Sequence, residues 1–249
     1  MTVLILAAGY AVRLKELTQD NPKPLLVVAG KTIIDRILEK VKGAGPAGKV
    51  YLITNAKFFG KFRDWHKASR YGAKVELIDD GSVSNETRLG AIRDIYLAIE
   101  KKAIDDDLLV IAGDNLFDFD LAKFRIFASS KVDGVSVAVH DIKDRDAAAR
   151  KFGVVMLDDD GVVADFEEKP EDPKSALIST GIYYFPRAKL SLIRDYVRTS
   201  DRLDAPGYYI SWMVKNDKVY GFTFSEDWYD IGDIESYRKA DSTYSKKEN

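Results

Sequence analysis

The sequence predicts an α/β fold in which helices cover both faces of a doubly wound, mostly parallel sheet. Short apolar runs alternate with amphipathic segments in the first half, the pattern expected when strands and helices follow one another in such a sheet. Two of the apolar runs end directly at a glycine or a glycine–aspartate pair, namely Gly9 and Gly113-Asp114. Ligands of open parallel sheets bind beyond the carboxyl ends of the strands, so both segments are candidates for a binding site.

The first half supplies the parallel strands. They are predicted over Thr2–Ala7, Val50–Thr54, Lys74–Ile78 and Leu108–Ala112. Helices are predicted over Thr32–Val41, Phe58–Ser69 and Glu86–Glu100. In the last of these segments, apolar side chains recur at helical spacing, at Leu89, Ile92, Ile95, Tyr96 and Ile99.

The second half has more strands in succession. They are predicted over Gly134–Val139, Gly153–Leu157, Val162–Glu167 and Leu177–Phe185, with a hairpin turn at Asp158–Gly161. Helices are predicted over Arg187–Val197, Tyr208–Lys215 and Ile234–Ala240. We expect a single domain over residues 1–249 that ends in a polar, frayed tail at residues 242–249.

The composition argues against several classes of protein. Lys and Arg number 38 against 40 Asp and Glu, so no nucleic-acid or membrane partner is expected. There are no cysteines, which excludes disulfides, thiolate metal sites and cysteine nucleophiles. No charged region precedes the short N-terminal apolar run, and no stretch is long enough to span a bilayer. We therefore expect a cytoplasmic protein.

The N-terminal segment has the features of a polyphosphate-binding loop. An apolar strand leads through Leu6, Ala7 and Ala8 into Gly9, where backbone N–H groups in a bend can face phosphate oxygens. Arg13 and Lys23 follow closely and can neutralise phosphate charge. Prolines on both sides of Lys23 fix its backbone, so the lysine is held in one orientation.

Five motifs, in order along nearly the whole chain, resemble those of the sugar-1-phosphate nucleotidylyltransferases. They are Leu6–Leu14 with Pro22-Lys23-Pro24, Gly113-Asp114-Asn115, Glu168-Lys169-Pro170, Ser179–Tyr183 and Trp228–Asp233. The look of the chain is most similar to the glucose-1-phosphate thymidylyltransferases. The resemblance implies a Rossmann-like sheet of the nucleotide-diphospho-sugar transferase type. Its nucleotide-binding half covers about residues 1–130 and its sugar-phosphate half about residues 131–240. No hexapeptide repeat is present, so a C-terminal β-helix is not expected.

The implied reaction is attack by a sugar-1-phosphate oxygen on the α-phosphorus of a nucleoside triphosphate, with pyrophosphate leaving. Two polyanions must approach each other, so catalysis consists mainly of charge neutralisation and alignment. The resemblance implies that Arg13, Lys23, Asp114 and Lys169 are catalytic. It also implies Mg²⁺ as cofactor, held by Asp114 and Asp230, because hard oxygen ligands suit this ion.

The resemblance assigns two further sets of residues. The nucleotide is expected at Leu6, Ala7, Ala8, Gly9, Arg13, Lys23, Ser84, Asn85, Thr87 and Asp114. The sugar phosphate is expected at Asn115, Gly153, Glu168, Lys169, Thr180, Gly181 and Tyr183. Two departures from the family pattern occur, Ala11-Val12 in the phosphate loop and the base-reading segment Gly81–Gly90.

Several local alternatives remain open. Asn85 can equally cap the helix that follows it, and Asp233 is more typical of an N-cap ahead of Ser236 than of a metal ligand. His66 and His140 are expected to be structural. An Asp-x-Asp string at Asp118–Asp120 formally matches the metal motif of nucleotide-sugar glycosyltransferases.

The substrates and the function class also have alternatives. dTTP or UTP with glucose-1-phosphate is favoured. Cytidylyl or uridylyl transfer to another sugar phosphate is the nearest alternative. A glycosyltransferase and a non-catalytic nucleotide-sugar sensor are the readings from other classes. A homodimer is compatible with the sequence, which does not reveal an interface.

Overall fold

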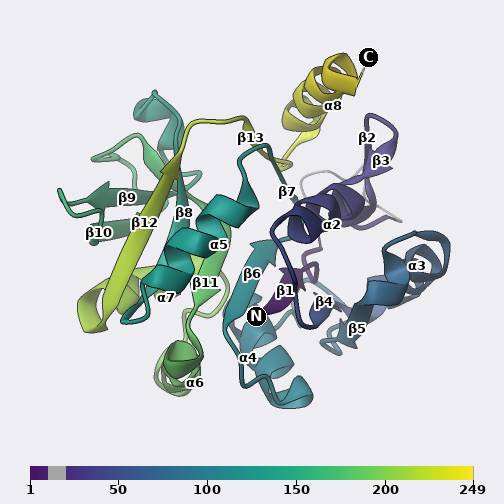
Figure 1. Ribbon diagram of the computed structural model, residues 1–249, viewed down its shortest axis with the longest axis horizontal. Helices are drawn as coiled ribbons and strands as arrows, with labels where there is room; N and C mark the ends of the chain where they lie inside the picture. The colour runs from purple at the N-terminus through teal and green to yellow at the C-terminus, as the bar shows by residue number, and fades with distance from the viewer. Residues whose placement is uncertain (11–20, 249) are drawn as a thin grey trace.

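The central feature of the structure, a computed structural model that describes residues 1–10 and 21–248, is a nine-stranded sheet (Figure 1). Seven strands follow the order β10-β9-β11-β6-β1-β4-β5. Off this path, β8 pairs with β11, and β12 pairs with β8. The strands of this sheet are β1 (Thr2–Leu6), β4 (Val50–Thr54), β5 (Val75–Asp79), β6 (Leu108–Ala112), β8 (Gly134–Asp141), β9 (Gly153–Leu157), β10 (Val163–Glu168), β11 (Leu177–Phe185) and β12 (Lys218–Phe224).

The first-half strands β1, β4, β5 and β6 are parallel. In the register, Ile5 of β1 lies between Leu52 of β4 and Ile111 of β6, and all three side chains are fully buried. Strands of a parallel sheet that is covered on both faces are expected to read as continuous apolar runs, as these do. The predicted doubly wound, mostly parallel sheet is therefore confirmed.

Helices cover both faces of the sheet (Figure 1). One hydrophobic core includes side chains of α2, α3, α5 and α8, and the other includes side chains of α4, α6 and α7. The helices are α2 (Ile33–Gly43), α3 (Ala56–Ala68), α4 (Ala91–Lys102), α5 (Leu121–Ser130), α6 (Leu190–Thr199), α7 (Pro206–Asn216) and α8 (Ile234–Glu248), with short 3-10 helices at Lys23–Leu25, Gly72–Lys74, Asp146–Ala148 and Arg187–Lys189.

The second half adds antiparallel strands to the parallel sheet. Strand β11 runs antiparallel to β6, β8 and β9, and β12 runs parallel to β8. Strands β9 and β10 form the predicted antiparallel hairpin, in which Gly161 N–H donates to the carbonyl of Asp158. This arrangement brings the Glu168-Lys169 segment, at the end of β10, to the same side of the molecule as Asp114.

Helix α4 begins later than the sequence predicts. Its N-cap is Gly90, whose φ of +89° lies in a region that favours glycine. A Cβ on Gly90 would lie 2.5 Å from the carbonyl oxygen of Leu203, so neither the conformation nor the space allows another residue without strain. The predicted start at Glu86 is therefore wrong, and so is the alternative that Asn85 caps this helix.

The C-terminal segment is helical, which corrects the expectation of a frayed tail at residues 242–249. The hydroxyl of Tyr244 donates to Asp118 over 2.8 Å, and Lys247 also pairs with Asp118. Arg36 forms a 2.9 Å ion pair with Glu248. The polar residues of this segment have partners on the body of the protein, so α8 continues to Glu248. At its start, Asp233 Oδ1 accepts from Ser236 N–H over 2.8 Å, as its prediction as a cap requires.

Two small sheets were not predicted because their strands are too short to show a pattern. One pairs β2 (Val27–Val28) with β3 (Lys31–Thr32), and the other pairs β7 (Asn115–Phe117) with β13 (Trp228–Asp230). The second places Asp230 opposite Asn115 and so brings the last motif of the sequence beside Asp114.

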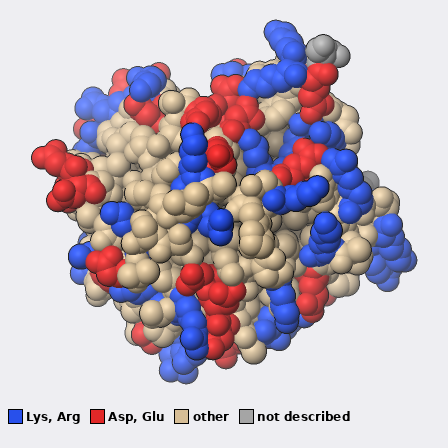
Figure 2. All heavy atoms as spheres, in the orientation of Figure 1, with Lys and Arg blue, Asp and Glu red and all other residues tan. Residues whose placement is uncertain are grey.

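The surface carries both charge signs. Figure 2 shows acidic and basic side chains interspersed over the face drawn. Of the helices in residues 1–10 and 21–248, none has the length and apolar character needed to cross a membrane.

Candidate active site

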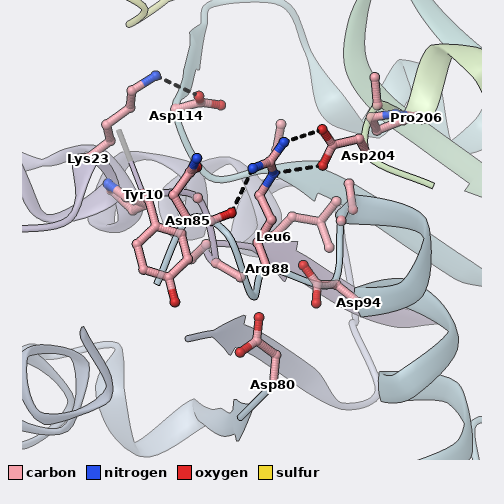
Figure 3. Close-up of a pocket in the computed structure, with 18 of the residues that line it drawn as sticks. Leu6, Tyr10, Lys23, Asp80, Asn85, Arg88, Asp94, Asp114, Asp204 and Pro206 are labelled. Carbon is pink, nitrogen blue, oxygen red and sulfur yellow. Dashed lines mark hydrogen bonds and ion pairs between the residues drawn. The ribbon is translucent and has the colours of Figure 1, made fainter. Parts of the chain in front are cut away.

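A cavity of about 580 Å³ lies at the carboxyl ends of β1 and β6 and receives residues from both halves of the chain (Figure 3). Its described lining includes eight residues that the sequence predicted for the site. They are Leu6, Ala7, Ala8, Gly9, Lys23, Asn85, Asp114 and Lys169. It also includes Arg88 and Gly90, which belong to the expected base-reading segment. The remaining lining residues were not expected, and these are Tyr10, Pro24, Asp80, Ala91, Asp94, Ala112, Asp204, Ala205 and Pro206.

The loop after β1 is fixed by hydrogen bonds to its backbone. Thr54 Oγ1 donates to the carbonyl of Ala7 over 3.2 Å, and Asn55 Nδ2 donates to that of Ala8 over 2.9 Å. Both side chains are fully buried. A Cβ on Gly9 would meet no described atom within 4 Å. Gly9 is therefore not demanded by packing, and it leaves open space where a phosphate can approach the backbone.

Lys23 and Asp114 form an ion pair in this cavity. Lys23 begins a 3-10 helix (Lys23–Leu25) and its Nζ lies 3.3 Å from Asp114 Oδ2. The lysine side chain is 14% exposed and the aspartate 34%, so both are partly withdrawn from water while remaining reachable from the cavity. Gly113, which precedes Asp114, packs against the end of β1 and against Pro24. A Cβ there would lie 2.6 Å from the carbonyl oxygen of Leu6 and 3.1 Å from Pro24 Cγ.

The segment after β10 presents Lys169 and holds Glu168. Lys169 has a φ of +51°, unusual for a residue with a side chain, and its ammonium group is half exposed at the cavity. Glu168 is 8% exposed and lies in a recess that small residues leave open. A Cβ on Gly207 would lie 1.8 Å from Glu168 Oε2, and one on Gly153 would lie 3.0 Å from the same atom. Burial raises the pKa of the Glu168 carboxyl.

Asp230 lines a second hollow, of about 760 Å³, which Lys169 also lines. Its strand is paired with that of Asn115, and the N–H of Ile231 donates to the carbonyl of Asp114 over 3.1 Å. Two carboxylates thus project from adjoining backbone segments. No group of three or more His, Asp or Glu side chains suited to a metal occurs in the described ranges. Asp114 lines the first cavity and Asp230 the second hollow. Mg²⁺ takes one or two carboxylates and completes its shell with water and substrate phosphates, so the pair is compatible with this ion, and its binding stays a prediction.

Several predicted sugar-phosphate residues lie in the wall behind the cavity. Asn115 and Thr180 are buried, with the amide of Asn115 donating to the carbonyl of Thr180 and the hydroxyl of Thr180 donating to that of Ala138. Tyr183 is buried and accepts from Ser179 Oγ over 3.3 Å. Gly181 has a φ of +75°, and a Cβ there would press on Asn115. In the described structure these residues shape the wall, and their contact with a sugar stays a prediction.

Of the three nucleotide-site residues predicted on the segment after β5, one lines the cavity and two do not. Asn85 lines the cavity, whereas Ser84 and Thr87 are absent from its described lining. The hydroxyl of Thr87 accepts from the N–H groups of Val83 and Ser84, so it closes the turn. Arg13 falls within residues 11–20, outside the described residues.

The cavity also contains charged residues that sequence reasoning missed. Arg88 pairs with Asp204, and Asp94 faces Asp80 from helix α4 (Figure 3). Asp94 could have been noticed as an acidic residue within the apolar stripe of a helix. No signal in the sequence points to Asp204, which lies 116 residues from Arg88.

Fold and cavity together define an α/β protein with a nucleotide-type site at the ends of parallel strands. Residues 2–247 match the family model described as nucleotidyl transferase, and the chain belongs to this family. The sequence resemblance is thereby confirmed at the level of the family.

Individual relatives agree with this assignment. The bifunctional protein GlmU of Methanocaldococcus jannaschii is 34% identical over 237 residues, which cover 93% of this chain and 51% of that protein. A glucose-1-phosphate adenylyltransferase of Thermomicrobium roseum is 30% identical over 257 residues, covering 96% of this chain and 58% of that protein. The chain therefore spans between half and three fifths of the length of these curated relatives.

A solved structure shares the fold. Apo UDP-glucose pyrophosphorylase superimposes with a TM-score of 0.82 at 20% sequence identity, covering 100% of this chain and 99% of that one. At this identity the likeness concerns the fold alone.

Proposed function

We propose that this protein is an enzyme that transfers a nucleoside monophosphate from a nucleoside triphosphate to a sugar-1-phosphate and releases pyrophosphate. One observation carries the proposal. A single cavity collects the phosphate-loop backbone, Lys23 and Asp114 from the first half and Lys169 from the second. Two anionic substrates that must meet need cations and a fixed alignment on both sides of the reacting phosphorus.

In the proposed reaction, an oxygen of the sugar phosphate attacks the α-phosphorus, and the bond between this phosphorus and the bridging oxygen of pyrophosphate breaks. Lys169 neutralises the sugar phosphate, and Lys23 with Arg13 neutralises the triphosphate. No catalytic base is required, because a phosphate monoester is already anionic near neutral pH. The protein therefore acts by holding two polyanions at reacting distance.

Mg²⁺ is the proposed cofactor, with Asp114 and Asp230 as ligands. Bound there, it would supply a positive charge that aligns the two phosphate groups and stabilises the leaving pyrophosphate. Lys23 neutralises Asp114 in this structure. Once another cation meets that charge, Lys23 becomes available to the phosphates.

The substrates are the finer part of the proposal. The resemblance favours glucose-1-phosphate with dTTP or UTP, and cytidylyl or uridylyl transfer to another sugar phosphate is the alternative. The similar proteins do not decide the base, because one is a glucose-1-phosphate adenylyltransferase and another, similar in fold, is a UDP-glucose pyrophosphorylase. We keep glucose-1-phosphate as the first acceptor to test. Two carboxyl groups of the cavity, those of Asp80 and Asp94, disfavour the carbonyl-rich edges of uracil and thymine and so argue against dTTP and UTP.

A glycosyltransferase is less well supported than a nucleotidylyltransferase. Its Asp-x-Asp marker would be Asp118 and Asp120, but Asp118 is paired with Tyr244 and Lys247, and Asp120 caps helix α5. Neither residue belongs to the described lining of the two hollows. Both aspartates thus stabilise helices, Asp118 through its contacts with α8 and Asp120 as the cap of α5.

The test is pyrophosphate release with Mg²⁺, measured for dTTP, UTP, CTP, GTP and ATP against several sugar-1-phosphates. Release that requires both substrates supports the proposed reaction. Release from no pair, by folded protein that still binds a nucleotide, contradicts it and favours a sensor or glycosyltransferase.

A further inference from the structure

Asp94 is a buried carboxyl in the proposed nucleotide cavity. It has no role in the proposed reaction, and the fold does not explain its burial. It is 5% exposed, lines the cavity from the first turns of helix α4, and its Oδ1 has no hydrogen-bond partner among the described residues. Burying a polar atom without a partner is destabilising, so a ligand that supplies the missing hydrogen bond would account for this carboxyl.

The neighbour of Asp94 is a second carboxyl, Asp80 (Figure 3). Asp80 accepts from the N–H of Ser82 over 2.6 Å and from its hydroxyl over 3.0 Å. Burial and the charge of Asp80 raise the pKa of Asp94 to about 8. At neutral pH Asp94 therefore keeps its proton and donates it to Asp80, which leaves one oxygen of Asp94 as an acceptor.

The three cationic side chains and the tyrosine hydroxyl of the described lining have partners other than Asp80 and Asp94. Lys23 is paired with Asp114, Arg88 with Asp204, and Lys169 with Glu168. The hydroxyl of Tyr10 is hydrogen-bonded to Ser82 Oγ over 3.0 Å. This end of the cavity thus offers hydrogen-bond acceptors and a negative charge, and it calls for a group that donates N–H bonds.

We propose that the Asp80–Asp94 pair selects a nucleobase with an exocyclic amino group, that is adenine, cytosine or guanine, over uracil and thymine. The proposal rests on the proposed function and names the substrate class of the same cavity. An amino group presents N–H donors to the carboxyl oxygens. The edge of uracil or thymine presents a carbonyl oxygen on each side of its single N–H, and these oxygens are repelled by the carboxyl pair.

The experiment measures dissociation constants of the five nucleoside triphosphates by calorimetry, without a sugar phosphate. The wild type is expected to bind at least one of ATP, CTP and GTP about tenfold or more tightly than UTP and dTTP. Asp94→Leu replaces the carboxyl oxygens by methyl groups in the same branched arrangement, and it should reduce this ratio to near one. Asp94→Asn can still donate to Asp80 and accept from a base, so it should keep the ratio.

Two further variants make the test specific. Asp80→Asn removes a charge at a buried position with little change in volume. It should also bring the ratio of dissociation constants closer to one, even where Asp94→Leu fails to fold. Asp79→Asn is the matched control, because Asp79 is the adjacent carboxylate and is absent from the described lining. It should leave all five constants unchanged.

The inference is overturned if UTP or dTTP binds most tightly to the wild type, if no nucleotide binds, or if Asp80→Asn leaves the ratio unchanged. Its failure differs from that of the proposed function. Pyrophosphate released best with dTTP or UTP would overturn the inference and keep the reaction. If ATP, CTP or GTP binds more tightly than UTP and dTTP as expected, but no pyrophosphate is released with any sugar-1-phosphate, the inference is kept and the proposed reaction is overturned.

Discussion

The guanidinium of Arg88 grips the carboxylate of Asp204 with two hydrogen bonds, of 2.8 Å from Nε and 2.6 Å from Nη2. The same guanidinium donates from Nη1 to the carbonyl of Asn85 over 2.6 Å. One side chain therefore joins the turn that carries Asn85 to a residue of the second half of the chain.

The first prediction is that Arg88→Gln raises the KM for the nucleoside triphosphate several-fold with little loss of stability. The pair is about half exposed, so its contribution to the free energy of unfolding is about 1 kcal/mol or less. Its effect on binding is larger because it positions the Asn85 turn. Arg187→Gln is a matched control, since Arg187 and Asp105 form an equally forked, exposed pair that is absent from the described lining. Equal effects of both variants on KM would contradict the positioning role.

The second prediction concerns Asp114. Asp114→Asn removes a negative charge but little volume, so turnover should fall by at least about 100-fold while the thermal unfolding midpoint changes little. Turnover is measured across a range of Mg²⁺ concentrations. Asp159→Asn, an exposed residue in the β9–β10 turn, is expected to behave as wild type. Full activity of Asp114→Asn at saturating Mg²⁺ would remove Asp114 from the reaction.

Local patterns were sufficient to predict most of the fold. Apolar runs such as Leu108–Ala112 are buried on both faces, and their burial in the sheet follows from composition alone. Where local and tertiary signals compete, prediction failed. The apolar spacing that begins at Leu89 predicts a helix there, but the helix begins only after Gly90, where the backbone of Leu203 leaves no room for a side chain. The polar tail is likewise helical only because Asp118 and Arg36 supply distant partners.

The residues of the cavity likewise fall into those that local motifs predicted and those that only tertiary packing brings there. Lys23, Asp114 and Lys169 stand in short motifs, and all three line the cavity, while their roles in the reaction stay predictions. Asp204 and Asp94 carry no such motif. They reach the cavity because helix α7 packs against both β10 and α4. Such juxtapositions depend on tertiary packing, which a single sequence does not display.

The third prediction tests the recess around Glu168. In Gly207→Ala the new Cβ must displace the Glu168 carboxyl, which lies 1.8 Å from its ideal position. Lys169 should move with it, so the KM for the sugar-1-phosphate is expected to rise about tenfold or more while nucleotide binding is kept. Gly60→Ala, in helix α3 with no described atom within 4 Å, is the control for the substitution itself. A KM unchanged by Gly207→Ala would show that the sugar phosphate does not depend on this segment.

The fourth prediction uses the shifted pKa of Asp94. Its ordinary value is 3.8, whereas in the folded protein burial and Asp80 raise the pKa to about 8. Below pH 4 both folded and unfolded chains carry this proton. Between about pH 4 and 8 the unfolded chain releases the proton and the folded protein retains it, so the contribution of Asp94 to wild-type stability falls as pH rises through this window and levels off above it.

Asp94→Asn keeps the shape of the protonated carboxyl but cannot ionise. The variant should therefore gain stability over wild type with rising pH, by up to about 1.4 kcal/mol per pH unit within the window. Urea unfolding at pH 5, 6, 7 and 9 measures the difference, with Asp79→Asn as a control whose difference from wild type should stay flat over the same range. A constant difference between Asp94→Asn and wild type would mean that Asp94 is ionised in the folded protein. The carboxyl pair would then carry two negative charges at neutral pH, and a base with amino groups would be bound through charge rather than through a shared proton.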